Sequence, residues 1–432
     1  LFYLFRIQSV EFNKDQYLNS IININQNILN EAREKDKVKP ESIYSLHGIP
    51  VLLKDNINYD GLPTTAGSFA LNNNKTKNAF VVEKLLENGA LILGKTNLSE
   101  WAYYFCSNCP SGYSAMGGQT LNPYGRKKFD SGGSSSGSGV AISANFSSVS
   151  LGSETSGSIL SPSSANSIVG LKPTIGLVSR SGIVPISSTL DTSGPMTKNV
   201  IDNAIVLKAI SGFDQDDTFS VKKNNIDLES IINSSLKGKR FGVFNDFLDD
   251  SLYSNAIKKI EKLGGIIINF DPPQVDFSGF RKILDFDMKN DLPKYFKENN
   301  ISFNSVKDVI EFNMKDSLKR APYGQGIFKS INLDSTQFEE ISIIKSRIKK
   351  EGKKYFNTAI ETHQLDAIIS INNYHAGYAA GAYYPCLTIP MGYNKDGKPY
   401  NLTFISQSFT ENKLLQIGYA FEKETNYRTI PF

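Results

Sequence analysis

The sequence predicts an α/β protein in which a large, mixed and twisted β-sheet is flanked by α-helices. Three observations support this prediction. Apolar runs of strand length, such as residues 49–53 and 90–93, end at polar residues, and segments with helical periodicity separate such runs. Residues 239–270 read as a strand, a helix and a second strand, the βαβ pattern of a continuing sheet. With 432 residues, of which 40% are hydrophobic, the chain can bury a large core, and we expect one domain over residues 1–432.

Composition narrows the possible partners and locations. The 47 basic and 43 acidic side chains are mixed along the chain and give a net charge of +4, so nucleic acid is not expected as a partner. No apolar run approaches the roughly 18 residues of a membrane helix, so we expect no transmembrane segment. Residues 1–5 are too short for a signal peptide, and the sequence does not begin with Met. We therefore expect a soluble, trimmed chain whose targeting segment could be missing, with a cytoplasmic location slightly favoured. The sequence does not define the oligomeric state.

Cysteine and histidine usage argues against a metal site. Cys106 and Cys109 form a C-x-x-C pair, for which we expect incidental packing, with a disulfide as the alternative. No second Cys or His pair stands at ligand spacing, and the three histidines are scattered along the chain: His47, His363 and His375. We expect neither a metal nor another cofactor.

Four elements are expected before residue 100. Residues 18–24 read as a strand followed by a helix to about residue 37, and residues 80–87 read as a helix that ends at Gly89. Between them, the apolar run 49–53 ends in Lys54, Asp55 and Asn56. Reactive groups of α/β proteins lie just beyond the carboxyl ends of strands, which is where Lys54 would lie. The alternative is a lysine that merely marks the exit of the strand to solvent.

Residues 89–96, GALILGKT, match the phosphate-binding pattern G-x-x-x-x-G-K-[ST]. In a phosphate-binding loop the four variable residues follow a strand and wrap the phosphates with free N–H groups. Here they are Ala-Leu-Ile-Leu, which should form the strand itself, so nucleotide binding is not expected.

Two irregular segments remain open at this point. Residues 101–124 are rich in aromatic side chains and either wall a substrate pocket, with Trp101 and Tyr104 as candidates, or pack in the core. Residues 132–139, GGSSSGSG, have the composition of a flexible linker. They open directly into the apolar segment 140–146, however, which favours a loop whose free N–H groups hold an anion or a polar side chain.

An ordered set of motifs resembles the amidase signature family. The motifs are KDN from Lys54, GKTNLSE from Gly94, GGQT-x-NP from Gly117, GGSSSGSG from Gly132, GSETSGSI from Gly152, GLKPT from Gly170 and GPMT from Gly194. Residues 384–392, YPCLTIPMG, are similar to the closing segment of that family. The resemblance implies the amidase-signature fold, with a signature core over about 45–200, a variable insertion over about 214–350 and a sheet-completing segment over about 360–432.

The resemblance also implies a Ser–cis-Ser–Lys triad. Ser158 would be the nucleophile, Ser134 the bridging serine after a cis peptide bond, and Lys54 the general base. Backbone N–H groups of one turn would form the oxyanion hole and contact the substrate; the turn comprises Thr155, Ser156, Gly157 and Ser158.

The chemistry of amide hydrolysis agrees with this assignment. It needs an activated nucleophile, a group that takes and returns its proton, and donors for the oxyanion. None of the three histidines lies in a nucleophile-like context, so a neutral lysine would have to act as the base. Lowering a lysine pKa from about 10.4 to near 7 disfavours its charge by roughly 4 to 5 kcal/mol, and burial at the end of an apolar strand is a plausible cause.

Two departures from the family pattern bear on function. Position 156 is Ser where many members have Asp or Gly, which a backbone role tolerates. Position 160 is Leu where the A subunits of amidotransferases tend to have Arg, which favours a free-standing amidase. We expect hydrolysis of a small-molecule or peptide amide through an acyl-enzyme on Ser158. The alternatives are the A subunit of a glutamine-dependent aminoacyl-tRNA amidotransferase and a catalytically inactive interaction module.

The second half is less informative. Residues 239–244 and 265–270 read as strands around a helix at 255–263, and residues 274–335 read as an insertion over the pocket. A long charged helix over 337–361 leads into a strand at 365–371. Residues 374–382 are expected to form a small-residue loop that could approach the active site.

Overall fold

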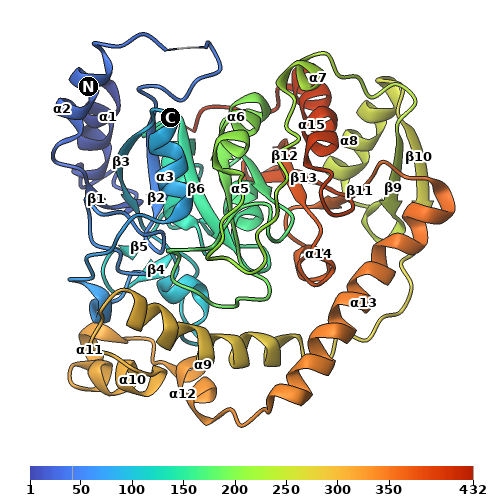
Figure 1. Cartoon of the computed structure of the whole chain (residues 1–432). Coiled ribbons are helices and arrows are strands. Elements are labelled where there is room, and N and C mark those ends of the chain that lie inside the picture. Colours follow the sequence, from blue (N-terminus) through green and yellow to red (C-terminus); the bar gives the residue numbers. More distant parts are fainter. Residues whose placement is uncertain (41, 432) are drawn as a thin grey trace.

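A central sheet of eleven strands organises the chain, as the computed structural model describes it for residues 1–40 and 42–431 (Figure 1). The strand order is β1-β3-β2-β6-β8-β7-β12-β13-β11-β9-β10, with parallel and antiparallel neighbours mixed, so the predicted fold class is confirmed. The strands are β1 (Ile21–Ile24), β2 (Pro50–Lys54), β3 (Leu91–Thr96), β6 (Val149–Glu154), β7 (Val169–Lys172), β8 (Thr192–Thr197), β9 (Arg240–Phe244), β10 (Ile266–Phe270), β11 (Ala367–Ile371), β12 (Cys386–Tyr393) and β13 (Pro399–Ile405). A separate two-stranded ribbon joins β4 (Tyr113–Ser114) and β5 (Gly118–Gln119).

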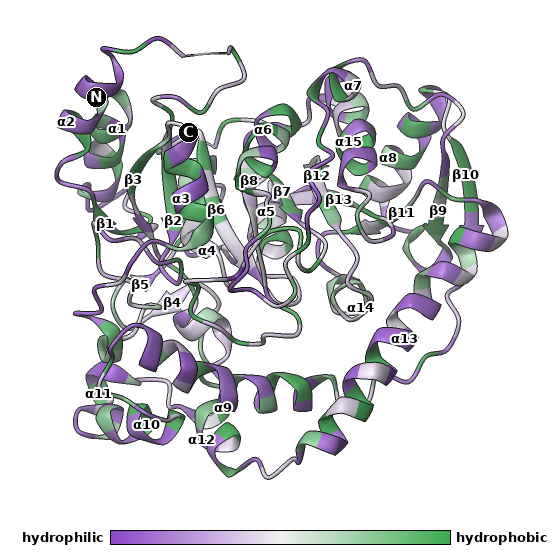
Figure 2. Ribbon diagram, in the orientation of Figure 1, coloured by the Kyte–Doolittle hydropathy of each residue, from purple (hydrophilic) through white to green (hydrophobic). Residues whose placement is uncertain are grey.

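Helices cover both faces of the sheet. The larger core lies against α3 (Phe80–Glu87), α6 (Val200–Ile210), α7 (Leu228–Ile232), α8 (Ser251–Lys262) and α15 (Glu411–Thr425). The other face packs against α4 (Ser136–Ser143), α5 (Leu160–Ala165), α13 (Phe338–His363) and α14 (Ala376–Ala382), with α1 (Phe2–Glu11) and α2 (Ile28–Lys35) near β1. Figure 2 shows hydrophobic residues on strands such as β2 and β9, as expected for strands buried on both faces.

A group of helices inserted between β10 and α13 lies beside the sheet rather than on it (Figure 1). It comprises α9 (Phe280–Glu298), α10 (Val306–Met314), α11 (Ser317–Arg320) and α12 (Gly326–Leu333). These helices have their own apolar cluster, which includes Trp101, Phe105 and Phe328. Short 3₁₀ turns stand at Phe69–Leu71, Glu100–Tyr103 and Asn245–Phe247. No helix among the described residues combines the length and apolar character needed to cross a membrane.

Three features differ from the sequence-based expectation. Residues 376–382 form helix α14 and not a loop, because four alanines in seven residues favour a helix and the segment packs against α13. Helix α1 was not anticipated. Cys106 and Cys109 are joined by a disulfide, so the prediction of incidental packing was wrong.

The phosphate-loop match is a strand, as expected. Residues 91–96 form β3, and Lys95 is buried. Its Nζ donates to the carbonyl of Ile57 at 2.5 Å and to Thr64 Oγ1 at 2.9 Å, and lies 3.4 Å from Asp55 Oδ1. The lysine therefore anchors the segment that follows Lys54 and has no surface on which to bind a phosphate.

Candidate active site

Two neighbouring parallel strands bring the predicted site residues to one place. Lys54 is the last residue of β2, and Ser158 follows β6 in the turn before α5. The strands pair in register, with Leu53 opposite Leu151. Because the carboxyl ends of parallel neighbours lie at the same edge of a sheet, the lysine and the turn meet there.

The orientation of Lys54 follows from the period of the strand. Val51 and Leu53 point into the larger core, so Leu52 and Lys54 point to the opposite face, which α4 covers. Ser134 stands just before α4 on that face. Nζ of Lys54 lies 2.7 Å from Ser134 Oγ, and it lies 2.9 Å from Oγ and 3.1 Å from the carbonyl oxygen of Ser153.

The Lys54 side chain is 0% exposed. Burial lowers the pKa of Lys54 to about 7, although the nearby carboxylates of Asp191 and Glu154 raise it in part. A large share of the amine is therefore uncharged near neutral pH and can accept a proton.

The loop before α4 fixes Ser134. The peptide bond between Gly133 and Ser134 is cis, as the resemblance implies, and the carbonyl of Ser134 accepts the N–H of Ser99 at 3.1 Å. A Cβ atom on Gly133 would lie 2.6 Å from the hydroxyl oxygens of both Ser99 and Ser111. Only glycine fits at that position, and the loop is a packed part of the site.

A buried carboxylate, which the sequence argument missed, shapes the turn that carries Ser158. Glu154 accepts N–H groups from Gly157 at 2.7 Å, Ile159 at 2.6 Å and Leu160 at 2.9 Å. Burial raises the pKa of Glu154, and the charge of Lys172 opposes that shift. The sequence did contain a signal for Glu154, because this residue lies inside the GSETSGSI motif.

Ser158 is partly exposed, and its carbonyl accepts the N–H of Ser135 at 3.1 Å. Its hydroxyl is not hydrogen-bonded to Ser134 or Lys54, and catalytic contacts of this kind commonly tighten only when substrate binds. Gly157 has φ +110°, and a Cβ there would lie 3.0 Å from Asn373 Nδ2, so its conformation and its neighbour both require glycine.

Ser158 opens into a cavity of about 600 Å³, called here the catalytic cavity. The turn Thr155, Ser156, Gly157 and Ser158 forms part of its wall, together with Gly132, Gly133, Asn372, Asn373, Tyr374, Tyr400 and Leu284 of α9. Tyr104 also lines it and donates its hydroxyl to Asp285 Oδ1 at 2.6 Å. Trp101 does not line it, because its ring is buried against Phe328, with ring centroids 5.3 Å apart.

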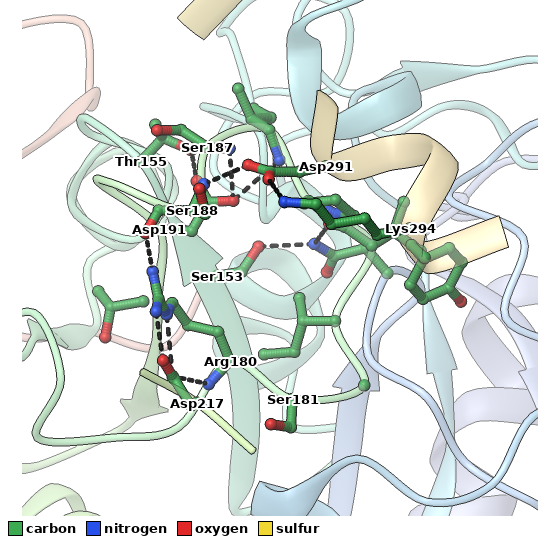
Figure 3. A pocket seen from close by; sticks show the side chains of 18 of the residues that line it. Ser153, Thr155, Arg180, Ser181, Ser187, Ser188, Asp191, Asp217, Asp291 and Lys294 are labelled. Carbon is green, nitrogen blue, oxygen red and sulfur yellow. Dashed lines mark hydrogen bonds and ion pairs between the residues drawn. The ribbon is translucent and has the colours of Figure 1, made fainter. Parts of the chain in front are cut away.

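A second cavity of about 660 Å³ lies next to the first (Figure 3). Ala102, Thr155 and Ile186 line both cavities. Ser153 and Asn56, which stand beside the Lys54 amine, line only the second. No group of three or more His, Cys, Asp or Glu side chains in residues 1–40 and 42–431 is arranged to hold a metal ion.

Comparison with known proteins places this arrangement among amidases. The family model described as Amidase matches residues 3–376. A probable amidase of Arabidopsis thaliana is 38% identical over 96% of this chain and 84% of its own length. The A subunit of the glutamyl-tRNA(Gln) amidotransferase of Thermoanaerobacter pseudethanolicus is 33% identical over 99% of this chain and 93% of its own. Among solved structures, the native peptide amidase of Stenotrophomonas maltophilia has a TM-score of 0.94 at 36% identity, covering 100% of this chain and 93% of that one.

Proposed function

This chain belongs to the amidase family and hydrolyses amide bonds, and we propose that it does so through an acyl-enzyme on Ser158, with Ser134 as the bridge and Lys54 as the base. One observation carries the assignment. The Lys54 amine, buried and with its pKa lowered to about 7, lies 2.7 Å from Ser134 Oγ, beside the turn that presents Ser158 to a cavity.

The hydrogen bonds of Lys54 suit a base. An uncharged amine has two hydrogens and one lone pair. The two hydrogens can be donated to the hydroxyl and carbonyl oxygens of Ser153, at 2.9 and 3.1 Å. The lone pair is then free to accept the hydroxyl proton of Ser134, which makes Ser134 an acceptor for the proton of Ser158.

The reaction has two halves. As Ser158 Oγ attacks the amide carbon, its proton passes to Ser134 and the proton of Ser134 passes to Lys54. When the tetrahedral intermediate collapses, the C–N bond breaks and the same path returns a proton to the departing nitrogen, which leaves as ammonia or an amine. Water then attacks the acyl carbon and gives a proton through Ser134 to Lys54. When the C–O bond to Ser158 breaks, that proton returns to Ser158 Oγ and the carboxylate leaves.

The oxyanion would be held by N–H groups of the 155–158 turn. The N–H of Gly157 already donates to the Glu154 carboxylate, so Gly157 is removed from the proposed oxyanion donors. The N–H groups of Thr155, Ser156 and Ser158 are not hydrogen-bonded within residues 1–40 and 42–431. They remain the candidates to bind the substrate oxygen.

A fluorophosphonate probe tests the assignment. We expect one labelled residue, Ser158, identified by peptide mass spectrometry, with no labelling in Ser158→Ala and slow labelling in Lys54→Ala. A panel of peptide, fatty, aryl and glutamine amides then defines the substrate. A folded wild-type chain that neither reacts with the probe nor hydrolyses any amide would be an inactive module.

Similarity to the A subunit of an amidotransferase supports a second candidate function, ammonia production for a partner protein. Leu160, at the position where such subunits tend to have Arg, is buried in an apolar cluster with Phe356 and Ala376, which favours the free-standing amidase. Glutamine turnover that appears only with a partner would reverse this preference.

A further inference from the structure

The cavity beside Thr155, called here the acidic side cavity, differs in charge from the catalytic cavity. Five carboxylates line it against two cationic side chains, a difference of three negative charges; the carboxylates are Asp191, Asp216, Asp217, Asp291 and Glu298, and the cations are Arg180 and Lys294. Figure 3 shows the Arg180–Asp217 pair and the Asp291–Lys294 pair on opposite sides of the cavity, with Ser153 between them. Each cation is thus already next to a carboxylate of the wall.

Three carboxylates of the wall have no cationic partner in contact. Asp216 and Glu298 are exposed at the rim, and no described cation lies within ion-pair distance of either. Asp191 lies deeper, where its carboxylate accepts the Thr155 hydroxyl at 2.5 Å and the N–H of Ile186 at 2.8 Å. These bonds stabilise a carboxylate, although burial raises the pKa of Asp191 to about 6.

An unpaired acceptor adds an observation independent of the charges. Asn56 lines the cavity and is 2% exposed. Its amide nitrogen donates to Ser153 Oγ at 2.9 Å, but its Oδ1 has no hydrogen-bond partner among the described residues. A buried acceptor without a donor is costly, and a donor group of a ligand could satisfy this oxygen.

Part of the remaining wall is apolar, and hydroxyl side chains line the rest. The segment 183–186, Ile-Val-Pro-Ile, lines the same cavity and can cover the methylene stem of a long side chain. The cavity thus offers carboxylate acceptors and an apolar surface, and it shares Ala102, Thr155 and Ile186 with the cavity that Ser158 lines. These features suit a ligand with a cationic end and an amide end.

We propose that the acidic side cavity binds the ammonium or guanidinium group of a substrate whose amide is held at Ser158. This inference rests on the proposed amidase function and adds the substrate class, amides that carry a basic side chain. Anionic amides are disfavoured by the same wall.

The test compares three α-amides whose side chains are cationic, neutral and anionic: N-acetyl-lysinamide, N-acetyl-norleucinamide and the α-amide of N-acetyl-glutamic acid, which keeps its side-chain carboxylate. We expect kcat/KM to fall in that order, with the lysine amide favoured over the norleucine amide about fivefold, mainly through KM. n-Pentylammonium should compete with the norleucine amide, and 1-pentanol should not.

A double variant in the acidic side cavity and a control variant elsewhere test whether this cavity sets the charge preference. In Asp216→Asn/Glu298→Gln, whose side chains are exposed, the ratio of kcat/KM for the lysine amide to that for the norleucine amide should approach one. The control Glu424→Gln, on the exposed face of α15, should keep the wild-type ratio. Hydrolysis of the norleucine amide with no charge preference, or a ratio unchanged in the double variant, would overturn the inference alone. Absence of both hydrolysis and Ser158 labelling would instead overturn the proposed function, and the inference with it.

Discussion

The carboxylate of Glu154 accepts the backbone N–H of Ile159 at 2.6 Å, so the turn that holds Ser158 is closed onto a buried acid. Two further N–H groups of the same turn bond to this carboxylate. The position of Ser158, the proposed nucleophile, therefore depends on a side chain that does not itself line the catalytic cavity.

Replacing Glu154 by Gln should lower kcat by about 10²-fold with little change in KM, because misplacing a reacting group by about an ångström costs that much. Glutamine keeps one acceptor oxygen and turns an NH₂ group toward N–H donors. Steady-state kinetics and the rate of fluorophosphonate labelling check this. Glu422→Gln, which alters another largely buried carboxylate bonded to a backbone N–H, is the control and should keep the wild-type kcat.

The pH dependence of turnover should report Lys54. Its pKa is lowered to about 7, and only the uncharged amine acts as a base, so kcat/KM should rise with pH and level off above about pH 8. One pH unit below the pKa, only about a tenth of the amine is uncharged. N-acetyl-norleucinamide, which does not titrate, is the suitable substrate. A flat profile from about pH 5 to about pH 9 would remove Lys54 from the role of base.

Asp191→Asn should move that rising limb to lower pH. The Asp191 carboxylate raises the pKa of Lys54, so its removal lets burial lower the pKa further. A shift of the midpoint to higher pH would show that the carboxylate does not act on the lysine. Circular dichroism should accompany the profile, because Asp191 also accepts N–H groups from residues 186 and 187.

Lys54 should also leave a signature in stability. Its pKa is about 7 in the folded chain and about 10.5 when unfolded, so between these values the unfolded state binds one more proton and stability rises with pH. From about pH 8 to about pH 9.5, the free energy of unfolding of the wild type should rise relative to that of Lys54→Met by about 1.4 kcal/mol per pH unit. Urea denaturation at several pH values measures the difference. Parallel curves for the two proteins would mean that the lysine is charged in the folded state.

Ser134→Ala should abolish the relay and lower kcat by several orders of magnitude, since the lysine then has no hydroxyl through which to reach Ser158. The neighbouring Ser138 is the matched control. Its hydroxyl bonds to the carbonyl of Leu151 at 3.1 Å and lies 2.8 Å from Thr96 Oγ1, away from both cavities. Ser138→Ala should lose about 1 kcal/mol of stability and keep its turnover. Equal losses of turnover in the two variants would argue for a structural role of Ser134.

Local sequence patterns predicted the elements whose residue spacing and residue types point to the same structure. The apolar run ending at Lys54 and the Gly/Ser loop before α4 were readable because strand period and glycine placement act over a few residues. Helix α14 was missed because its two glycines disfavour a helix and offset the four alanines that favour one. The spacing of Cys106 and Cys109 did not distinguish a disulfide from two packed cysteines, and the structure has the disulfide.

The acidic side cavity could not be predicted in the same way. Asn56, Asp191, Asp217 and Asp291 come from different segments of the chain, and no local pattern marks the three aspartates as neighbours of Asn56. Helix α9, which lies beside the sheet, brings Asp291 to the cavity that the other three residues line. Tertiary contacts of this kind have no local signal.

Strand β2, the loop before α4 and the turn after β6 hold the proposed proton-transfer groups, whereas α9 supplies Leu284 to one cavity and Asp291 to the other. The proposed catalytic residues and the α9 residues that line the cavities thus lie in different segments of the chain. Substitutions at the residues of α9 that line the two cavities would change which molecules are accepted without altering the proposed triad, and this separation is a route by which new specificities can evolve.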